Sequence, residues 1–176
     1  KPLTALVLAA LLGASLPLQA DIQQQRQAYD QAMSALKAGQ QQRYASLLPG
    51  LRDYPLYPYL LLESLQMRVK TASHREIEDF LVAHGDLPFA QRLKNDWLRR
   101  LAREGEWSLL RKNYDTASQA AEFDCPLALQ SWREGNQSAA MGRAAELWTV
   151  GRSQPNACDP LFDRWREAGG LTEDVA

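Results

Sequence analysis

The sequence predicts an all-α protein, an α-solenoid of stacked antiparallel helix pairs in repeats of about 33 residues that wind into a right-handed superhelix. Composition is the first observation behind this prediction. Leu (28), Ala (25) and Gln (15) are abundant in the chain of 176 residues, whereas Val and Ile together number only 7. Ala and unbranched side chains lose little entropy in a helix, whereas strands favour β-branched residues. A substantial β-sheet is therefore excluded.

A recurring helix-end pattern is the second observation. Basic residues in the last turn and a glycine just beyond it occur at Gly105, Gly135 and Gly169, and a similar end lies at Gly39. Glycine accepts the left-handed conformation that ends a helix, and cations suit the carboxyl end of its dipole. The last three glycines follow one another at the interval expected for one helical hairpin per repeat, and Gly39 precedes them by about two such intervals. A Lys-Thr-Ala segment at residues 70–72 lies halfway through that longer gap, at the expected place.

Apolar residues at i, i+3, i+4 and i+7 are the third observation, because this spacing places them on one helix face. Such faces occur in Leu93–Leu101, Cys125–Trp132 and Met141–Trp148. Since no hairpin can bury its apolar face alone, neighbouring hairpins must stack. We expect helices near residues 22–38, 40–48, 57–70, 74–84, 88–104, 106–113, 119–134, 137–150 and 159–168.

Two helix starts carry a proline signal. Asp124 lies shortly before Pro126, and Asp159 lies directly before Pro160. Each pair fits an N-cap region followed by proline in the first helical turn. The helix at 159–168 has no following partner in the sequence, and a solenoid needs a terminal cap. We therefore expect the helical array to continue beyond Ala176.

The first twenty residues have the pattern of a secretory signal peptide. Lys1 is followed by a mainly apolar run over residues 3–18, and a small residue closes the segment at Ala20. We expect cleavage after Ala20, so that residues 1–20 are removed and residues 21–176 are exported. The alternative is an uncleaved membrane anchor, although about sixteen apolar residues are short for a bilayer crossing.

Cys125 and Cys158 are the only two cysteines. In an exported protein, an even pair of cysteines forms a disulfide that persists in the oxidising compartment. We therefore expect a bridge between them, and the alternative is two buried free thiols.

Motifs for catalysis, metals and cofactors do not stand out. His74 and His84 are the only histidines, and no Cys or Asp lies at ligand spacing from them, so we expect no metal site and no cofactor. The sequence has neither a G-x-S-x-G motif nor a glycine-rich phosphate loop. Carboxylates such as Glu76 and Glu104 are expected on solvated helix faces. A net charge of −1 offers no basic excess for nucleic acid.

Aromatic residues supply the one candidate ligand contact. Tyr54, Tyr57 and Tyr59 are interleaved with prolines and, as rigid amphipathic rings, are suited to contact a glycan. The alternative is a turn that feeds a helix, with the rings packed between repeats. Four tryptophans fall on apolar helical stripes and are expected to pack in the core or between repeats: Trp97, Trp132, Trp148 and Trp165.

Two stretches resemble soluble lytic murein transglycosylases. The first is PGLRDYPLYPYL at residues 49–60, and the second is Glu-Leu-Trp at 146–148 followed by GRSQPNACDPLF at 151–162 and by Trp165. Aromatic and proline strings of this length rarely recur by accident. The resemblance extends over residues 21–170 and is weaker between 66 and 125.

The resemblance implies a periplasmic enzyme that cleaves the β-1,4 bond between N-acetylmuramic acid and N-acetylglucosamine in peptidoglycan and leaves a 1,6-anhydro sugar. A superhelical U domain forms a ring with a linker domain, and a lysozyme-like C-terminal domain carries one catalytic glutamate in a Glu-Ser motif. The only Glu-Ser here, Glu63-Ser64, matches the superhelical region. No residue of this chain therefore inherits a catalytic role. The U domain of the family carries a disulfide, which Cys125 and Cys158 match.

We therefore predict that residues 21–176 are the N-terminal part of a U domain, a scaffold without activity of its own. Its implied partners are the linker and catalytic domains of the same enzyme, and peptidoglycan strands reached through the catalytic domain. One alternative is a free-standing exported helical-repeat adaptor that binds a protein through its concave face. Another is an independent glycan-binding module that uses the three tyrosines. No nucleic acid and no stable membrane anchor are expected.

Overall fold

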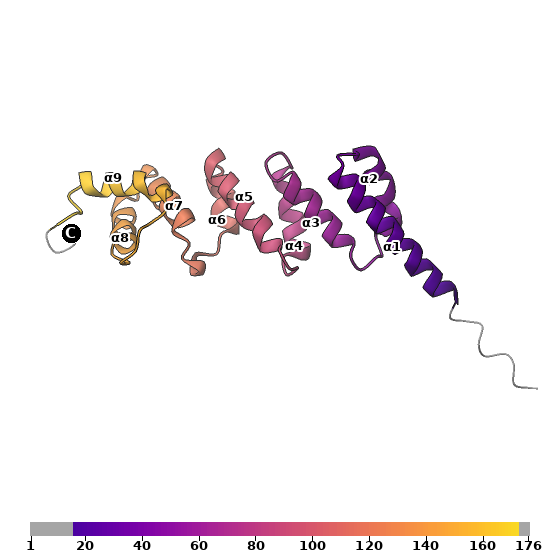
Figure 1. The fold of residues 1–176 in the computed structure, drawn as a ribbon. Coiled ribbons are helices and arrows are strands. Elements are labelled where there is room, and N and C mark those ends of the chain that lie inside the picture. The colour runs from indigo at the N-terminus through magenta and orange to yellow at the C-terminus, as the bar shows by residue number, and fades with distance from the viewer. Residues whose placement is uncertain (1–15, 173–176) are drawn as a thin grey trace, which may run out of the picture. The chain divides into compact units, whose positions relative to one another are not determined.

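The structure, a computed structural model, describes residues 16–172, and all regular structure in this range is helical (Figure 1). The α-helices are α1 (Leu16–Lys37), α2 (Gln41–Leu47), α3 (Tyr57–Met67), α4 (His74–His84), α5 (Ala90–Glu104), α6 (Trp107–Asn113), α7 (Ala121–Arg133), α8 (Gln137–Trp148) and α9 (Asp159–Glu167). Short 3-10 helices are η1 (Leu48–Leu51), η2 (Thr116–Ser118) and η3 (Asn156–Cys158). The prediction of an all-α fold is confirmed. Within the described range, no helix is both long and apolar enough to cross a membrane.

Residues 1–15 of the predicted signal peptide lie outside the described residues. The backbone of residues 16–20 is helical and continues into the rest of α1. The predicted cleavage point between Ala20 and Asp21 therefore lies within this helix.

The chain divides into two compact units between Ala90 and Gln91. In the first unit, α1, α2, η1 and α3 enclose a core. Ala32, Ala35 and Leu36 form one buried face of α1, at the spacing of helical turns. The hydroxyl of Tyr44 in α2 donates to the carbonyl of Leu60 in α3 at 3.3 Å, which links two helices of this core.

The helix α4 begins at an N-cap serine. The Ser73 hydroxyl accepts a hydrogen bond from the backbone N–H of Glu76 at 3.1 Å, and His74 is the first helical residue. The carboxylate of Glu76 also pairs with Arg68, which follows α3, at 2.7 Å. This surface ion pair joins the end of one helix to the start of the next.

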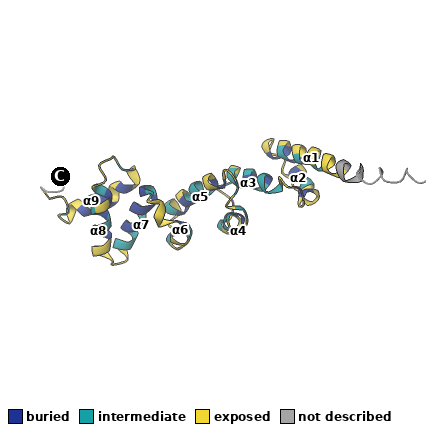
Figure 2. Cartoon of the chain, turned by 90° about the horizontal axis from the view of Figure 1, so that it is seen from below, coloured by how far each residue is buried: buried dark blue, intermediate teal, exposed yellow. Residues whose placement is uncertain are grey.

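In the second unit, α7, α8 and α9 share a core, and Figure 2 shows their buried residues where the three helices meet. Trp148 packs edge-on against Phe162, with ring centroids 5.1 Å apart, and also contacts Trp165 at 5.5 Å. Trp97 of α5 is fully buried, and the Trp132 ring lies 5.2 Å from the guanidinium of Arg164. Trp97, Trp148 and Trp165 therefore pack in the core or against it as predicted, whereas Trp132 stays half-buried.

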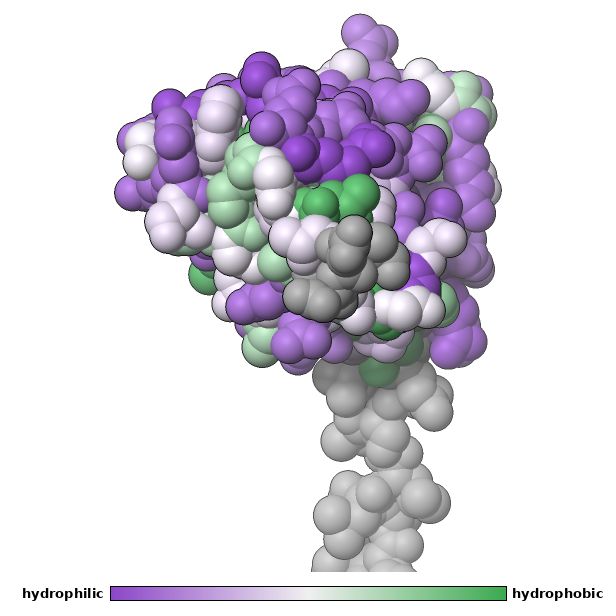
Figure 3. Space-filling view, turned by 90° about the vertical axis from the view of Figure 1, so that its left-hand side faces the viewer, coloured by the Kyte–Doolittle hydropathy of each residue, from purple (hydrophilic) through white to green (hydrophobic). Residues whose placement is uncertain are grey.

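Seen from the end at which α8 and α9 lie, the surface is mainly hydrophilic around a small hydrophobic patch (Figure 3). Val150, after α8, and Leu171, after α9, are large apolar residues that stay exposed in this part of the chain. The larger apolar side chains of α8 and α9, such as Leu147 and Leu161, are instead buried in the core.

Left-handed glycines end four helices, as the repeat pattern predicted. The φ angles are +69° at Gly39, +76° at Gly105, +100° at Gly135 and +80° at Gly169. The Gly135 N–H donates to the carbonyl of Trp132, and the next N–H donates to the carbonyl of Ser131, which is a Schellman motif. At the segment 70–72 the pattern was less accurate: α3 already ends at Met67, and the Arg68 N–H closes it without a left-handed residue.

The predicted start of the helix near 119–134 needs one correction. Helix α7 begins at Ala121, so Asp124 lies in its first turn and is not the N-cap, and Pro126 is the sixth helical residue. The prediction was wrong because the acid two residues before a proline imitates an N-cap signal. At α9 the signal was closer, since Asp159 is the first helical residue and Pro160 lies in the first turn.

Two glycines offer a matched test of this backbone analysis. A Cβ added to Gly135 or to Gly142 meets no atom within 4 Å, but only Gly135 has a left-handed φ. We expect Gly135→Ala to lower the free energy of unfolding by about 1 kcal/mol and Gly142→Ala, inside α8, to raise it by about 0.4–1 kcal/mol. All five tryptophans lie from Trp97 onward, so urea unfolding followed by tryptophan fluorescence reports on the second unit. Shifts of the same sign in both variants would contradict the analysis.

Candidate functional site

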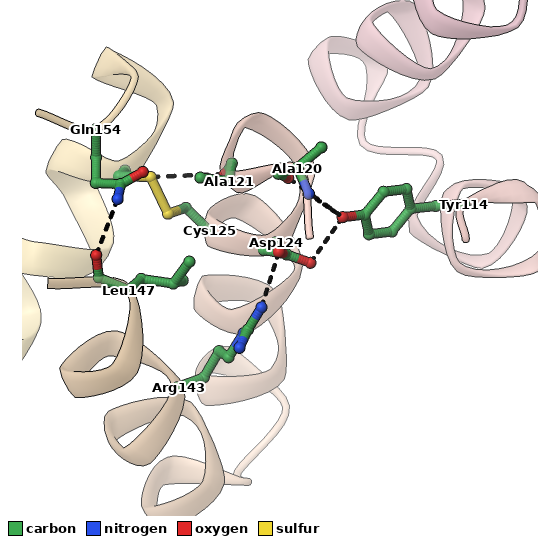
Figure 4. The surroundings of a disulfide bond; sticks show 9 residues. Tyr114, Ala120, Ala121, Asp124, Cys125, Arg143, Leu147 and Gln154 are labelled. Carbon is green, nitrogen blue, oxygen red and sulfur yellow. Dashed lines mark hydrogen bonds and ion pairs between the residues drawn. A yellow bond between two sulfur atoms is a disulfide. The ribbon is translucent and has the colours of Figure 1, made fainter. Parts of the chain in front are cut away.

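A disulfide joins Cys125 of α7 to Cys158 of η3, just before α9 (Figure 4). The S–S distance is 1.98 Å, the Cα atoms are 4.9 Å apart, and both residues are fully buried. The loop between α8 and α9 is held further by Gln154, whose side-chain amide donates to the carbonyl of Leu147 at 3.1 Å. The bridge therefore connects the ends of a 33-residue stretch inside the second unit.

Asp124, next to the disulfide, is a buried carboxylate with partners on both oxygens (Figure 4). The Tyr114 hydroxyl donates to Oδ1 at 2.9 Å, and the Arg143 guanidinium donates to Oδ2 at 2.8 Å. The backbone N–H of Ala120 donates in turn to the Tyr114 oxygen at 2.9 Å. This network ties α7 to α8 and to the segment before α7.

The protonation states of the groups in this network favour a structural role that holds α7 in place. Burial is the largest cause that raises the pKa of Tyr114 above its usual value near 10. Hydrogen bonding to Glu146, and in smaller part to Asp124, raises the pKa of Arg143. Because both oxygens of Asp124 already accept from protein donors, this carboxylate stabilises the fold and is not directed at a substrate. The sequence pattern did not reveal the network, because Tyr114 and Arg143 are 10 and 19 residues from Asp124.

The three candidate tyrosines differ in exposure. Tyr54 is only 8% exposed, and its ring packs against Tyr29 of α1 with centroids 5.5 Å apart. Tyr57 packs against the same core and is half-buried. Tyr59 is also half-buried. Only Tyr57 and Tyr59 therefore offer partly accessible rings, and a glycan contact at these tyrosines stays a prediction.

The Glu63-Ser64 pair lies in the middle of α3. Ser64 is buried, and its hydroxyl accepts hydrogen bonds from the Arg68 guanidinium at 3.3 and 3.4 Å. Among residues 16–172, no group of three or more His, Cys, Asp or Glu side chains is placed to hold a metal ion.

A pocket of about 350 Å³ lies within the second unit and is the candidate ligand site. One wall comes from α5 and the start of α6, where Arg99, Arg103 and Trp107 line it. Helix α7 contributes further lining residues, among them the apolar Phe123 and Leu129. Residues just before and within α9 complete the lining. The pocket is therefore lined by α5, α6, α7, η3 and α9, all in the second unit.

Charge in the pocket is uneven. Arg99 and Glu122, which both line the pocket, form a two-point ion pair, with Nε–Oε2 at 2.8 Å and Nη2–Oε1 at 3.0 Å. This hydrogen bonding raises the pKa of Arg99 above its usual value. Arg103 and Arg133 also line the pocket, are exposed, and have no ion pair within the described part of the chain. Two cationic groups therefore remain for a ligand.

Comparison with known proteins relates this chain to one group of enzymes. No protein-family model matches it. The soluble lytic murein transglycosylase of Escherichia coli is 35% identical over 160 residues, which cover 90% of this chain and 25% of that protein. Its counterpart from Salmonella typhimurium is 34% identical over 148 residues, which cover 84% of this chain and 23% of that protein. This chain is homologous to the soluble lytic murein transglycosylases.

Solved structures of lytic transglycosylases have the same helical fold. An inactive mutant of lytic transglycosylase Slt from Pseudomonas aeruginosa superposes with a TM-score of 0.74 at 42% identity, covering 84% of this chain and 24% of that one. The soluble lytic transglycosylase Slt70 from Escherichia coli gives a TM-score of 0.70 at 33% identity, covering 86% of this chain and 24% of that one. The chain thus spans about a quarter of the length of the transglycosylases it matches. The predicted resemblance is confirmed.

The disulfide provides the second testable prediction. Reduction with dithiothreitol is expected to lower the free energy of unfolding of the second unit by about 3–4 kcal/mol, because it releases a loop of some 33 residues in the unfolded chain. Urea unfolding followed by tryptophan fluorescence, with and without reductant, measures the loss. A double variant, Cys125→Ser with Cys158→Ser, controls for other effects of the reductant and should not respond to it. An unchanged midpoint on reduction of the native chain would contradict the prediction.

The third prediction concerns Tyr114→Phe. At pH 8 the variant is expected to lose about 1–3 kcal/mol of stability, because Asp124 and the Ala120 N–H lose a buried partner. A folded-state pKa above 10 means that the native protein loses stability as the pH rises past about 10, where only the unfolded tyrosine ionises.

The difference in the free energy of unfolding between the native protein and Tyr114→Phe, called the gap below, should therefore shrink between pH 8 and pH 11. Tyr29 and Tyr44, whose pKa values burial also raises, are present in both proteins, so their alkaline effect cancels in the comparison. Urea midpoints at the two pH values measure the gap. A gap that stays constant or widens with pH would refute the role given to the Tyr114 hydroxyl.

Proposed function

We propose that residues 21–176 form the N-terminal part of the superhelical U domain of a periplasmic lytic murein transglycosylase. The observation that carries the proposal is homology over 84–90% of the chain to about a quarter of each such enzyme. The helix-ending glycines and the helical hairpins of each unit support a scaffold role, because stacked helical repeats are typical of scaffolds.

The reaction of the whole enzyme is cleavage of the β-1,4 bond between N-acetylmuramic acid and N-acetylglucosamine, with a 1,6-anhydro product. A domain outside this chain carries the catalytic glutamate. Within residues 16–172, the chemistry favours this division: Asp124 has protein partners on both oxygens, and Glu63-Ser64 lies in a packed helix. The chain supplies structure, and its partners are the linker and catalytic domains of the same enzyme.

Export fits this assignment, because murein lies outside the inner membrane. The apolar run at residues 3–18 supports a cleaved signal peptide. A disulfide in the second unit further supports an oxidising compartment.

The fourth prediction is that the purified chain releases no anhydromuropeptides from murein sacculi. The reason is that this scaffold carries no catalytic Glu-Ser site in its described part, and chromatography of the soluble products is the measurement. The full-length Escherichia coli relative serves as the positive control. Release of anhydromuropeptides by the chain itself would overturn the assignment of catalysis to another domain.

The coding sequence on both sides of this segment distinguishes the proposed scaffold of a larger enzyme from a free-standing adaptor. A downstream lysozyme-like domain with a Glu-Ser motif, in the same reading frame, supports the proposal. A stop codon soon after Ala176 would contradict it and favour a free-standing helical-repeat adaptor.

A further inference from the structure

The pocket in the second unit holds more cationic charge than its own fold uses. Glu122, the carboxylate among its lining residues, is engaged with Arg99 through both oxygens. Arg103 lies in the last turn of α5 and Arg133 ends α7, and both line the pocket from exposed positions. Neither has an ion pair within the part of the chain that the structure describes. An anion is therefore the complementary ligand.

The rest of the lining is apolar or aromatic. Phe123 and Leu129 are buried, Trp107 is half-buried, and Pro160 adds an exposed apolar edge. A bare inorganic anion makes no use of such walls, since they repel a fully hydrated ion and attract C–H groups. The ligand that fits carries carboxylates next to aliphatic carbon.

Backbone chemistry adds an acceptor. Because Pro126 has no N–H, the carbonyl of Glu122, four residues earlier in α7, lacks the helical donor that it would otherwise receive. Both residues line the pocket. A peptide, unlike a simple carboxylic acid, carries amide N–H groups that are donors for such a carbonyl.

The volume of the pocket and the net charge of the chain limit the class of ligand further. A volume of about 350 Å³ suits a peptide of a few residues and is too small for a folded partner. The chain carries a net charge of −1, so it lacks the broad positive field that a polyanion such as nucleic acid requires. A neutral sugar would leave the two arginines without counter-charges.

We propose that this pocket binds a short acidic peptide, and that its source is the stem peptide of murein. The charges and the apolar walls of the pocket support an acidic peptide as the ligand. The choice of murein as the source of this peptide rests on the proposed function above. Arg103 and Arg133 bind the carboxylates, and Trp107 packs against the aliphatic part of the peptide. A scaffold with such a site holds the peptide side of the cell wall while another domain acts on the glycan.

The test is calorimetric titration of the purified chain with the stem tripeptide L-alanyl-γ-D-glutamyl-meso-diaminopimelate. We expect saturable binding that weakens at least tenfold in Arg103→Gln and in Arg133→Gln, because each loses a charged hydrogen bond. Arg92→Gln is the matched control, since Arg92 is an exposed arginine of the same α5 outside the pocket. Binding in this control should equal that of the native chain. Thermal unfolding of all variants checks that they stay folded.

Two further ligands test whether the pocket selects an acidic peptide over an uncharged peptide and over a neutral sugar. The same tripeptide with every carboxylate converted to an amide should not bind, and neither should a neutral oligosaccharide of N-acetylglucosamine. The proposal is wrong if the native chain does not bind the tripeptide, if the amidated peptide or the sugar binds equally well, or if both arginine variants bind like Arg92→Gln. Such a failure leaves the coding-sequence test of the proposed function unaffected, so the two proposals fail separately.

Discussion

A helical hairpin has one apolar side that it cannot cover by itself, and every other feature of this protein depends on that constraint. Apart from α1, the helices are short, with α2 at 7 residues and α5 at 15 residues, so each gains its stability by packing and not by length. Stacking requires each helix to stop sharply and the chain to reverse. Left-handed glycines such as Gly39 and Gly135 do this, because only a residue without Cβ adopts that backbone conformation at low cost.

The second unit adds covalent and polar links to this packing. Asp124 and Cys125 are adjacent in α7 but bind different elements. Cys125 is bonded to Cys158, just before α9, whereas Asp124 is hydrogen-bonded to Tyr114 and to Arg143 of α8. Packing of Trp148 against Phe162 joins α8 to α9 directly. Helix α7, held in this way, also lines the pocket with Pro126 and Arg133. A rigid helix suits a small binding site, because it holds the side chains that contact a ligand in fixed positions.

Local patterns anticipated the helices because helix formation depends on near neighbours. Helix starts such as His74 and Gln137 follow from apolar spacing and end signals within a few residues. Asp124 shows where this logic fails. Its neighbours imitate an N-cap, yet it is a buried acid, since Tyr114 and Arg143 approach it from other elements.

The pocket was hidden for a similar reason. Arg103 and Arg133 occupy equivalent places in two of the repeated helix-end patterns, where each reads only as a cation that suits the helix dipole. Nothing in either pattern indicates that both side chains line one pocket, because that depends on how α5 packs near α7.

By itself, the sequence determined the all-α class, the glycines that end four of the helices, and the similarity to lytic transglycosylases. These properties reside in composition and in spacings of a few residues, which a chain carries before it folds. Only the tertiary structure decided the partners of Asp124, the burial of Tyr54 and the meeting of two arginines at the pocket, which have no ion pair within residues 16–172. Long-range contacts of this kind depend on how helices pack, and packing is a property of surfaces in three dimensions that no short stretch of sequence contains.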